Sequence, residues 1–236
     1  MAEARRVRNW PDIAEGTLDD MLRVLENPTR RRILERLARE SHYPLQLSKE
    51  LGVSQQAVVK HLKALEESGL VASVEEKSDL GGPSRRAYTA THAVSLRIDV
   101  GRSLFRAEMR PLDDPAERVE GYAWAEDALA RAREEKDVRR RVRRLAEVVQ
   151  RLNGEIEALD RKRAYLVRLK DAALREVHGG VEDVLRSYDE RQVLYCLVEE
   201  GGRDLDGIAE SLDLREKVVQ DLVRRIEREF AFEWDG

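Results

Sequence analysis

The sequence has a single cysteine, few aromatic residues and no long apolar run, and each shortage excludes a class of protein. Cys196 alone cannot form an intramolecular disulfide or a cysteine-ligated metal site. Aromatic residues make up only 5% of the 236 residues, which favours several small cores over one large core. No apolar run approaches the about 20 residues of a membrane-spanning helix. Because the charged N-terminus lacks the apolar stretch of a signal peptide, we expect a soluble, cytoplasmic protein.

Charged residues are abundant and unevenly distributed. They make up 38% of the chain, whereas ordinary globular domains have about 25%. Such an excess is typical of long solvated helices. The net charge of −4 conceals an acidic segment, residues 179–236, with 8 basic and 16 acidic side chains. We therefore do not expect this segment to contact a polyanion.

Residues 18–91 have the pattern of a winged helix-turn-helix domain. Pro28 and Pro44 suit the first turns of two short amphipathic helices, the second with leucines turned inward at Leu45, Leu47 and Leu51. Gly52 can end that helix in the left-handed conformation, and Ser54 can cap the helix that follows. An alternating strand at 70–75, a loop at 78–84 and a second strand from Arg85 form a wing. A helix, a glycine-containing turn and a second helix are typical of DNA-binding proteins.

The helix after Ser54 is the predicted recognition helix. Glutamine can pair with adenine, and lysine can reach guanine or phosphate, when the start of such a helix enters a major groove. Arginines on the wing can enter the minor groove or hold its phosphates. The alternative is that these side chains form an ordinary solvated surface. The residues predicted to contact DNA are Thr29, Arg30, Arg31, Ser54, Gln55, Gln56, Val59, Lys60, Lys63, Arg85 and Arg86.

Three stretches of this domain resemble the ArsR-type winged-helix transcription regulators: ENPTRRRIL at 26–34, GVSQQAVVKHLKALEESGLV at 52–71 and GPSRRAY at 82–88. The arrangement of the whole chain is similar to that of the archaeal sulfur-response regulators. The resemblance implies a homodimer on a roughly palindromic promoter element. It also implies that the face from Gln55 to Lys63 reads the sequence of double-stranded DNA.

The chain departs from those families at their sensing sites. The sulfur-response regulators have a CxxC motif where this chain has Arg39–His42, so a dithiol switch is impossible here. The four histidines, His42, His61, His92 and His178, lack the spacing of metal ligands. We expect no metal and no cofactor. No arrangement of carboxylates or glycines resembles a catalytic site, so we also predict that the protein is not an enzyme.

Residues 92–121 read as a β-hairpin and a proline-containing hinge, and residues 122–178 as a long helix with apolar residues every seven positions. β-branched residues in one row and leucines in the other favour a parallel two-stranded coiled coil. The alternative is an antiparallel helix that folds back on its own domain. Arg163 and Lys170 interrupt the β-branched row. The predicted dimerisation residues are Val138, Val142, Leu145, Val149, Leu152, Ile156, Leu159 and Leu166.

Residues 179–236 repeat the apolar positions of the first domain at a shift of 161 residues, without a gap. One short strand at 230–234 is the most that can remain of a wing. The predicted fold is mainly α with small β wings: a winged helix-turn-helix, a coiled-coil helix and a degenerate C-terminal winged-helix-like domain. We predict a homodimeric, sequence-specific transcription regulator with an unidentified small-molecule effector bound between the hairpin and the long helix. The alternative is a scaffold for protein partners with weak or absent DNA binding.

Overall fold

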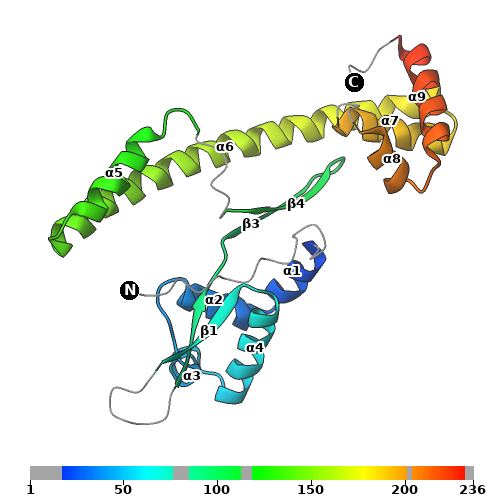
Figure 1. The fold of residues 1–236 in the computed structure, drawn as a ribbon. Helices are drawn as coiled ribbons and strands as arrows, with labels where there is room; N and C mark the ends of the chain where they lie inside the picture. Colours follow the sequence, from blue (N-terminus) through cyan, green and yellow to red (C-terminus); the bar gives the residue numbers. More distant parts are fainter. Residues whose placement is uncertain (1–17, 77–84, 113–118, 201–203, 232–236) are drawn as a thin grey trace. The chain divides into compact units, whose positions relative to one another are not determined.

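The computed structural model describes residues 18–76, 85–112, 119–200 and 204–231. The chain divides into two compact units, one made of residues 1–98 and 107–118, the other of 99–106 and 119–236. The fold is mainly helical with two small antiparallel strand pairs, as predicted (Figure 1). In these described ranges no helix is both long and apolar enough to cross a membrane.

The first unit begins with four short helices: α1 (Leu18–Leu25), α2 (Pro28–Leu37), α3 (Pro44–Leu51) and α4 (Gln55–Glu67). Asn27 caps α2, because its side chain accepts hydrogen bonds from the backbone N–H groups of Thr29 and Arg30. Gly52 ends α3 with φ +68°, a conformation that a side chain would strain. Ser54 then caps α4. The predicted helix ends at Pro28, Pro44 and Gly52 and the predicted cap at Ser54 are confirmed.

The core of this unit lies between the helices and the first strand pair. Val58, Leu62 and Leu65 of α4 pack against Ile33, and none of these side chains is exposed to solvent. Leu47 of α3 is likewise fully buried. The expectation that Leu45 also points inward is wrong, because its side chain is 51% exposed. A helix of eight residues has a narrow buried stripe, which Leu47 and Leu51 occupy alone.

Strands β1 (Val71–Glu76) and β2 (Arg85–Ala90) form the antiparallel wing, with Val71 opposite Ala90 and Glu76 opposite Arg85. A second antiparallel pair follows, β3 (Val94–Val100) and β4 (Phe105–Pro111). The predicted hairpin is thus present. The boundary between the two units crosses it: Val94, Leu96 and Met109 pack on the first core, while residues 99–106 belong to the second unit. Of the two prolines that mark the predicted hinge, Pro111 ends β4, and Pro115 lies outside the described residues.

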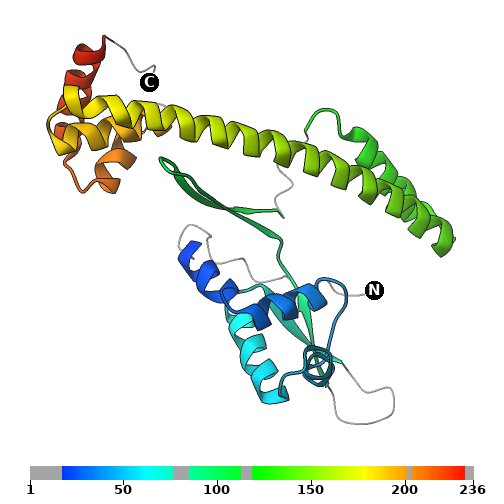
Figure 2. The same ribbon diagram turned by 180° about the vertical axis from the view of Figure 1, so that it is seen from behind.

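The second unit is built on helix α6 (Val138–Val184), which has 47 residues. The prediction of one long helix over 122–178 is wrong in two respects. Residues 123–134 form a separate helix, α5 (Ala123–Glu134), which Figures 1 and 2 show folded back along the N-terminal part of α6. At its other end, α6 continues through Gly179 and Gly180, although glycine inside a helix costs about 1 kcal/mol relative to alanine. The domain boundary predicted there is therefore a helix interior.

The tip of the β3–β4 hairpin is held against α6 by two carboxylates. Asp99 forms a two-pronged ion pair with Arg163, whose Nη1 lies 3.0 Å from Asp99 Oδ1. Asp171 accepts a hydrogen bond of 2.8 Å from the backbone N–H of Ser103. A β-carbon at Gly101 would stand 2.2 Å from the Asp171 carboxylate, so only glycine permits this approach. This hydrogen bond from Ser103 lowers the pKa of Asp171, with a further contribution from Arg175.

The C-terminal helices α7 (Tyr188–Glu200), α8 (Leu205–Ser211) and α9 (Glu216–Phe230) form a second helix-turn-helix at the end of α6, seen in both views (Figures 1 and 2). Val219 and Ile226 are buried like Val58 and Leu65, the residues 161 positions earlier. Asp213 adopts the left-handed conformation, φ +53°, at the position that corresponds to Gly52. The predicted repeat is confirmed for these helices. Phe230 is the last residue of α9, not the start of a strand, and residues 232–236 are outside the described chain.

Helix α3 provides a matched test of this packing. We expect Leu47→Ala to lower the free energy of unfolding by about 2–5 kcal/mol, because it removes a fully buried side chain. Leu45→Ala removes the same atoms from the exposed side of α3 and should change that free energy by at most about 0.5 kcal/mol. Urea unfolding followed by circular dichroism measures both. Similar losses for the two variants would contradict the packing described here.

Candidate nucleic-acid interface

Helix α4 presents an uninterrupted exposed face. Gln56, Val59, Lys60 and Lys63 follow one another at helical spacing on the side opposite the buried residues, and Gln55 precedes them at the first turn. Val59 is 44% exposed, although it is apolar. The predicted recognition residues of α4 are therefore brought together on one accessible surface. This surface has the composition that can form hydrogen bonds and apolar contacts with base edges.

The start of α4 has donors available for a phosphate oxygen. The Ser54 hydroxyl oxygen accepts a hydrogen bond of 3.2 Å from the backbone N–H of Ala57. Its hydroxyl hydrogen can still donate outward. At the other end of this face, Lys63 Nζ lies 3.7 Å from Glu67 Oε1, and both side chains are largely exposed. Such an exposed pair is weak and can open to a stronger anion.

The two wing arginines do not share one surface. Arg85 and Arg86 are both exposed and are consecutive in β2, where successive side chains point to opposite faces. Arg86 pairs in register with Glu75, and Arg85 with Glu76. The two arginines therefore point to opposite faces of the wing, and their contacts with DNA stay a prediction. The tip of the wing, residues 77–84, lies outside the described residues.

The arginines at the start of α2 have an intramolecular role that the sequence did not indicate. Arg30 donates hydrogen bonds to the carbonyls of Arg23 and Val24, and Arg31 donates to those of Leu25 and Glu26. These carbonyls end α1, where cationic side chains stabilise the helix. The use of Arg30 and Arg31 as phosphate ligands stays a prediction. Both arginines also stabilise the end of α1. Thr29 is half-buried, whereas Arg32, next to them, is exposed and has no partner within the described residues.

The stretch that carries a CxxC motif in the sulfur-response regulators has a structural role here. His42 is buried and forms a two-way backbone bridge with Tyr88 of β2. Its Nδ1–H donates to the carbonyl of Glu40 at 3.0 Å, and its Nε2 lies 3.3 Å from Glu50 Oε1. His42 therefore ties the connection between α2 and α3 to the wing. Across the described ranges, no group of three or more histidine, cysteine or acidic residues could hold a metal ion.

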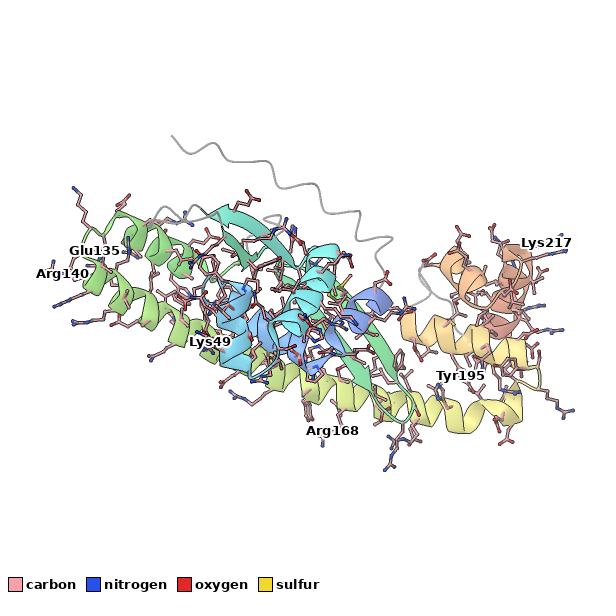
Figure 3. The ribbon with its side chains drawn as sticks, turned by 90° about the horizontal axis from the view of Figure 1, so that it is seen from below. Lys49, Glu135, Arg140, Arg168, Tyr195 and Lys217 are labelled. Carbon is pink, nitrogen blue, oxygen red and sulfur yellow. The ribbon has the colours of Figure 1, made fainter. Side chains whose placement is uncertain are left out.

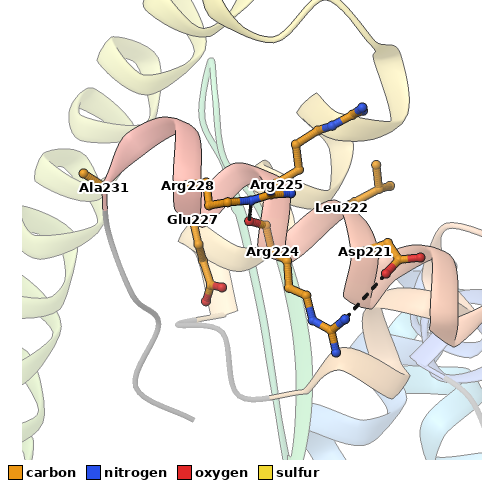
Figure 4. A pocket seen from close by; sticks show the side chains of 7 residues that line it. All are labelled: Asp221, Leu222, Arg224, Arg225, Glu227, Arg228 and Ala231. Atoms are coloured by element: carbon orange, nitrogen blue, oxygen red, sulfur yellow. Dashed lines mark hydrogen bonds and ion pairs between the residues drawn. The ribbon is translucent and has the colours of Figure 1, made fainter.

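The second helix-turn-helix lacks the surface of the first. Glu216 and Lys217 stand where α4 has Gln55 and Gln56, and Asp221 replaces Lys60. Asp221 pairs with Arg224 at 3.7 Å on the outer side of α9 (Figure 4). Arg215, at the cap position, makes no side-chain capping hydrogen bond, unlike Ser54. The two domains thus share a core but differ in the residues that they expose.

The predicted dimerisation residues lie along one side of α6. Val138, Val142, Val149, Ile156, Leu159 and Leu166 are exposed, whereas Leu145 and Leu152 are half-buried. Helix α5 accounts for part of this difference: Arg151 stacks 3.7 Å above the Trp124 ring, and Val148 is buried beside α5. Charged residues such as Arg140 and Arg168 project elsewhere from α6 (Figure 3). In this single chain, most of the predicted seam is uncovered.

The tip of the hairpin contacts the long helix directly in the region where an effector is predicted. Polar contacts of Asp99 and Ser103 place the hairpin tip directly on α6. A largely apolar pocket of about 490 Å³ lies elsewhere in the second unit, between the end of α6, α7 and α9. Its lining includes Val177, Val181, Leu194, Val198, Ile226 and Phe230. The effector itself stays a prediction.

Sequence reasoning missed the ionic contacts of α6. Asp99 and Arg163 are 64 residues apart, and Ser103 and Asp171 are 68 residues apart. The only available signal was Arg163 itself, a charged residue in an apolar row. Lys170, the second interruption, donates a hydrogen bond of 3.3 Å to the carbonyl of Glu199 in α7. Both interruptions thus mark places where α6 binds other parts of its own unit.

Comparison with known families identifies the domain that contains α4. Residues 25–74 match the family model of a helix-turn-helix domain, which spans α2, α3, α4 and the start of β1. The match supports a winged helix-turn-helix domain of the DNA-binding regulator type. A search of curated proteins finds no significant match to the chain.

His61 of α4 provides a pH test of this region. Partial burial lowers the pKa of His61 below its ordinary value, and the nearby charges of Arg30 and Lys60 lower it further. Near and below the ordinary pKa of histidine, the unfolded chain therefore protonates at His61 more readily than the folded chain does. The free energy of unfolding falls as the pH drops from this ordinary pKa through the lower pKa of the folded chain. We expect His61→Gln to flatten this decline. Urea unfolding between pH 5 and 8, together with NMR titration of His61, measures both; a pKa at or above the ordinary value would contradict the assignment.

Proposed function

We propose that this protein is a sequence-specific, homodimeric transcription regulator of the ArsR type that reads a promoter element through α4. The observation that carries the proposal is the exposed face of Gln55, Gln56, Val59, Lys60 and Lys63, held outward by a fully buried opposite face. The helix-turn-helix match over residues 25–74 supports the same activity. The proposed activity is binding and not catalysis.

The proposal assigns different roles to different side chains. Gln55 and Gln56 stand at the start of α4, where a helix that enters a major groove meets base edges. Ser54 and the wing arginines Arg85 and Arg86 are suited to phosphate oxygens, which position a protein without reading sequence. In a homodimer, two copies of α4 would occupy successive major grooves about 34 Å apart. The exposed apolar row of α6 supports the homodimer, since such a surface is ordinarily covered.

The competing function is a protein-interaction scaffold, which the acidic second helix-turn-helix favours. Mapping of bound sites across the genome separates the two, because a regulator enriches defined promoter fragments and a scaffold does not. The duplex recovered in this way serves as the cognate site in the binding measurements below. Absence of any fragment preference at moderate salt would contradict the proposed function and favour the scaffold.

Gln56→Ala should reduce sequence discrimination. A good side-chain contact with a base edge contributes about 1–3 kcal/mol to discrimination, so affinity for the cognate duplex should fall by about tenfold or more while affinity for random duplex changes little. Fluorescence anisotropy with both duplexes measures the ratio. The matched control is Lys217→Ala, at the corresponding position of the second helix-turn-helix (Figure 3), which should change neither affinity. Equal losses on both duplexes would contradict a base contact by Gln56.

Arg86→Ala should weaken binding to cognate and random duplexes by a similar factor. An arginine that neutralises one phosphate releases about one counterion, so the slope of log affinity against log salt should become shallower by about 0.9. Titrations at several salt concentrations measure this slope. An unchanged slope would exclude Arg86 as a phosphate ligand, and a loss confined to the cognate duplex would assign it to base recognition.

A further inference from the structure

We propose that two copies of this chain pair through α6 in antiparallel orientation, along residues 138–163. This inference rests on the proposed homodimer and adds its direction and register. It differs from the parallel coiled coil that the seven-residue pattern favours. Three features of α6 point to it: where the exposed apolar row ends, how charge is distributed along the helix, and which side α5 covers.

The apolar row available to a second copy ends at Arg163. That residue interrupts the β-branched row, and its guanidinium is bound to Asp99 of the same chain. Beyond this point the hairpin tip and α7 contact α6. Leu166 is still exposed but lies past this boundary. The continuous seam is therefore confined to residues 138–163, which span about 37 Å at the rise of an α-helix.

Charge is distributed asymmetrically within this segment. Residues 138–144 contain five arginines and no acidic residue, whereas residues 152–160 contain Glu155, Glu157 and Asp160 and no basic residue. A parallel copy would place five arginines beside five arginines. In the antiparallel register described below, residues 138–144 lie opposite the partner's residues 157–163, which include Arg161 and Lys162 as well as Glu157 and Asp160. Arg139 then comes beside the partner's Asp160, whereas a parallel copy places Glu155 beside the partner's Asp160. Such complementary charges favour one orientation and disfavour the other.

One antiparallel register uses all the seam residues between these charged ends. Val142 then faces the partner's Leu159, Leu145 faces the partner's Ile156, and Val149 faces the partner's Leu152. The two-fold axis repeats each contact, as in any isologous interface. Each layer joins one β-branched residue to one leucine, so all layers have similar volume. The same register places Val138 opposite the partner's Arg163, where the row ends.

Flanking side chains fit this register as well. Arg139 comes beside the partner's Asp160, and neither side chain has an ion-pair partner among the described residues of its own chain. Ala146 comes beside the partner's Asn153, which allows close approach near the axis. The opposite flank is occupied by α5, which contacts Arg144, Val148 and Arg151. Helix α5 therefore leaves the seam open and covers only one of its flanks.

Cysteine cross-linking distinguishes the two orientations. In the antiparallel register, Val142 and its own copy are about 25 Å apart along the axis, far beyond the about 7 Å that a disulfide can bridge. We therefore expect Val142→Cys alone and Leu159→Cys alone to give no cross-linked dimer under oxidation. A mixture of the two single variants, unfolded and refolded together, should give a disulfide-linked dimer. Cys196→Ala is the parent of all variants, and its thermal melt is compared with that of the natural chain.

The control pair is Val142→Cys mixed with Val149→Cys, which is about 15 Å out of register and should give no dimer between the two variants. Cross-linking of either single variant with itself would show a parallel coil and overturn the orientation, while the homodimer would stand. A monomeric mass for the natural chain in light scattering would overturn both the seam and the homodimer. Neither cross-linking nor light scattering involves DNA. A failure of α4 to bind DNA would therefore be detected separately, in the binding measurements of the proposed function.

Exchange of charge tests the register independently of cysteines. Asp160→Arg places two arginines together at each end of the antiparallel seam and should weaken dimerisation by about tenfold. Adding Arg139→Asp restores opposite charges and should return the affinity to within about threefold of the natural chain. In a parallel coil Asp160→Arg would instead face the partner's Glu155 and strengthen the dimer. Analytical ultracentrifugation over a range of concentrations measures all three chains, and a strengthened dimer would overturn the proposal.

Discussion

Burial of one side of α4 determines what the first domain presents to its surroundings. Val58, Leu62 and Leu65 are fully covered by α2 and the wing, so rotation of α4 about its axis would expose apolar surface and bury polar side chains. Exposing a single leucine costs about 1.5–3 kcal/mol, which fixes the rotation. The direction of Gln56 and Lys63 is therefore a consequence of the core. Specific recognition by rigid side chains requires such an anchored helix.

The same core supports two different surfaces within one chain. The second helix-turn-helix keeps the buried positions, with Val219 and Ile226 in place of Val58 and Leu65, and even keeps the left-handed residue of the turn. Its exposed face differs, with Glu216 and Asp221 at the positions of Gln55 and Lys60. Packing constrains volume and polarity at buried sites, whereas exposed sites can change without loss of the fold. Function therefore has to be argued from the surface of each copy, not from the fold that they share.

Helix α6 combines two kinds of neighbours along its length. Its N-terminal part carries an uncovered apolar row with α5 at one flank, and its C-terminal part binds the hairpin tip and α7 of its own unit. Charged residues at row positions 163 and 170 mark the change. Interruptions of this type are often read as register devices in coiled coils. Here intramolecular ion pairs and hydrogen bonds account for them.

Local patterns in the sequence were sufficient for the first domain. Pro28, Gly52 and Ser54 act through backbone geometry and caps within a few residues, so the ends of α2, α3 and α4 and the outward face of α4 were predictable, as was the repeat in α7, α8 and α9. Only the tertiary structure decided that Leu45 is exposed, that Arg30 and Arg31 hold the end of α1, that the segment 122–178 divides into α5 and α6, and that Asp99 binds Arg163. Most of these outcomes depend on contacts between segments that are separated in the chain, which local patterns do not record. A seven-residue repeat of apolar residues is also the same whether a second chain or another helix of the same chain covers it.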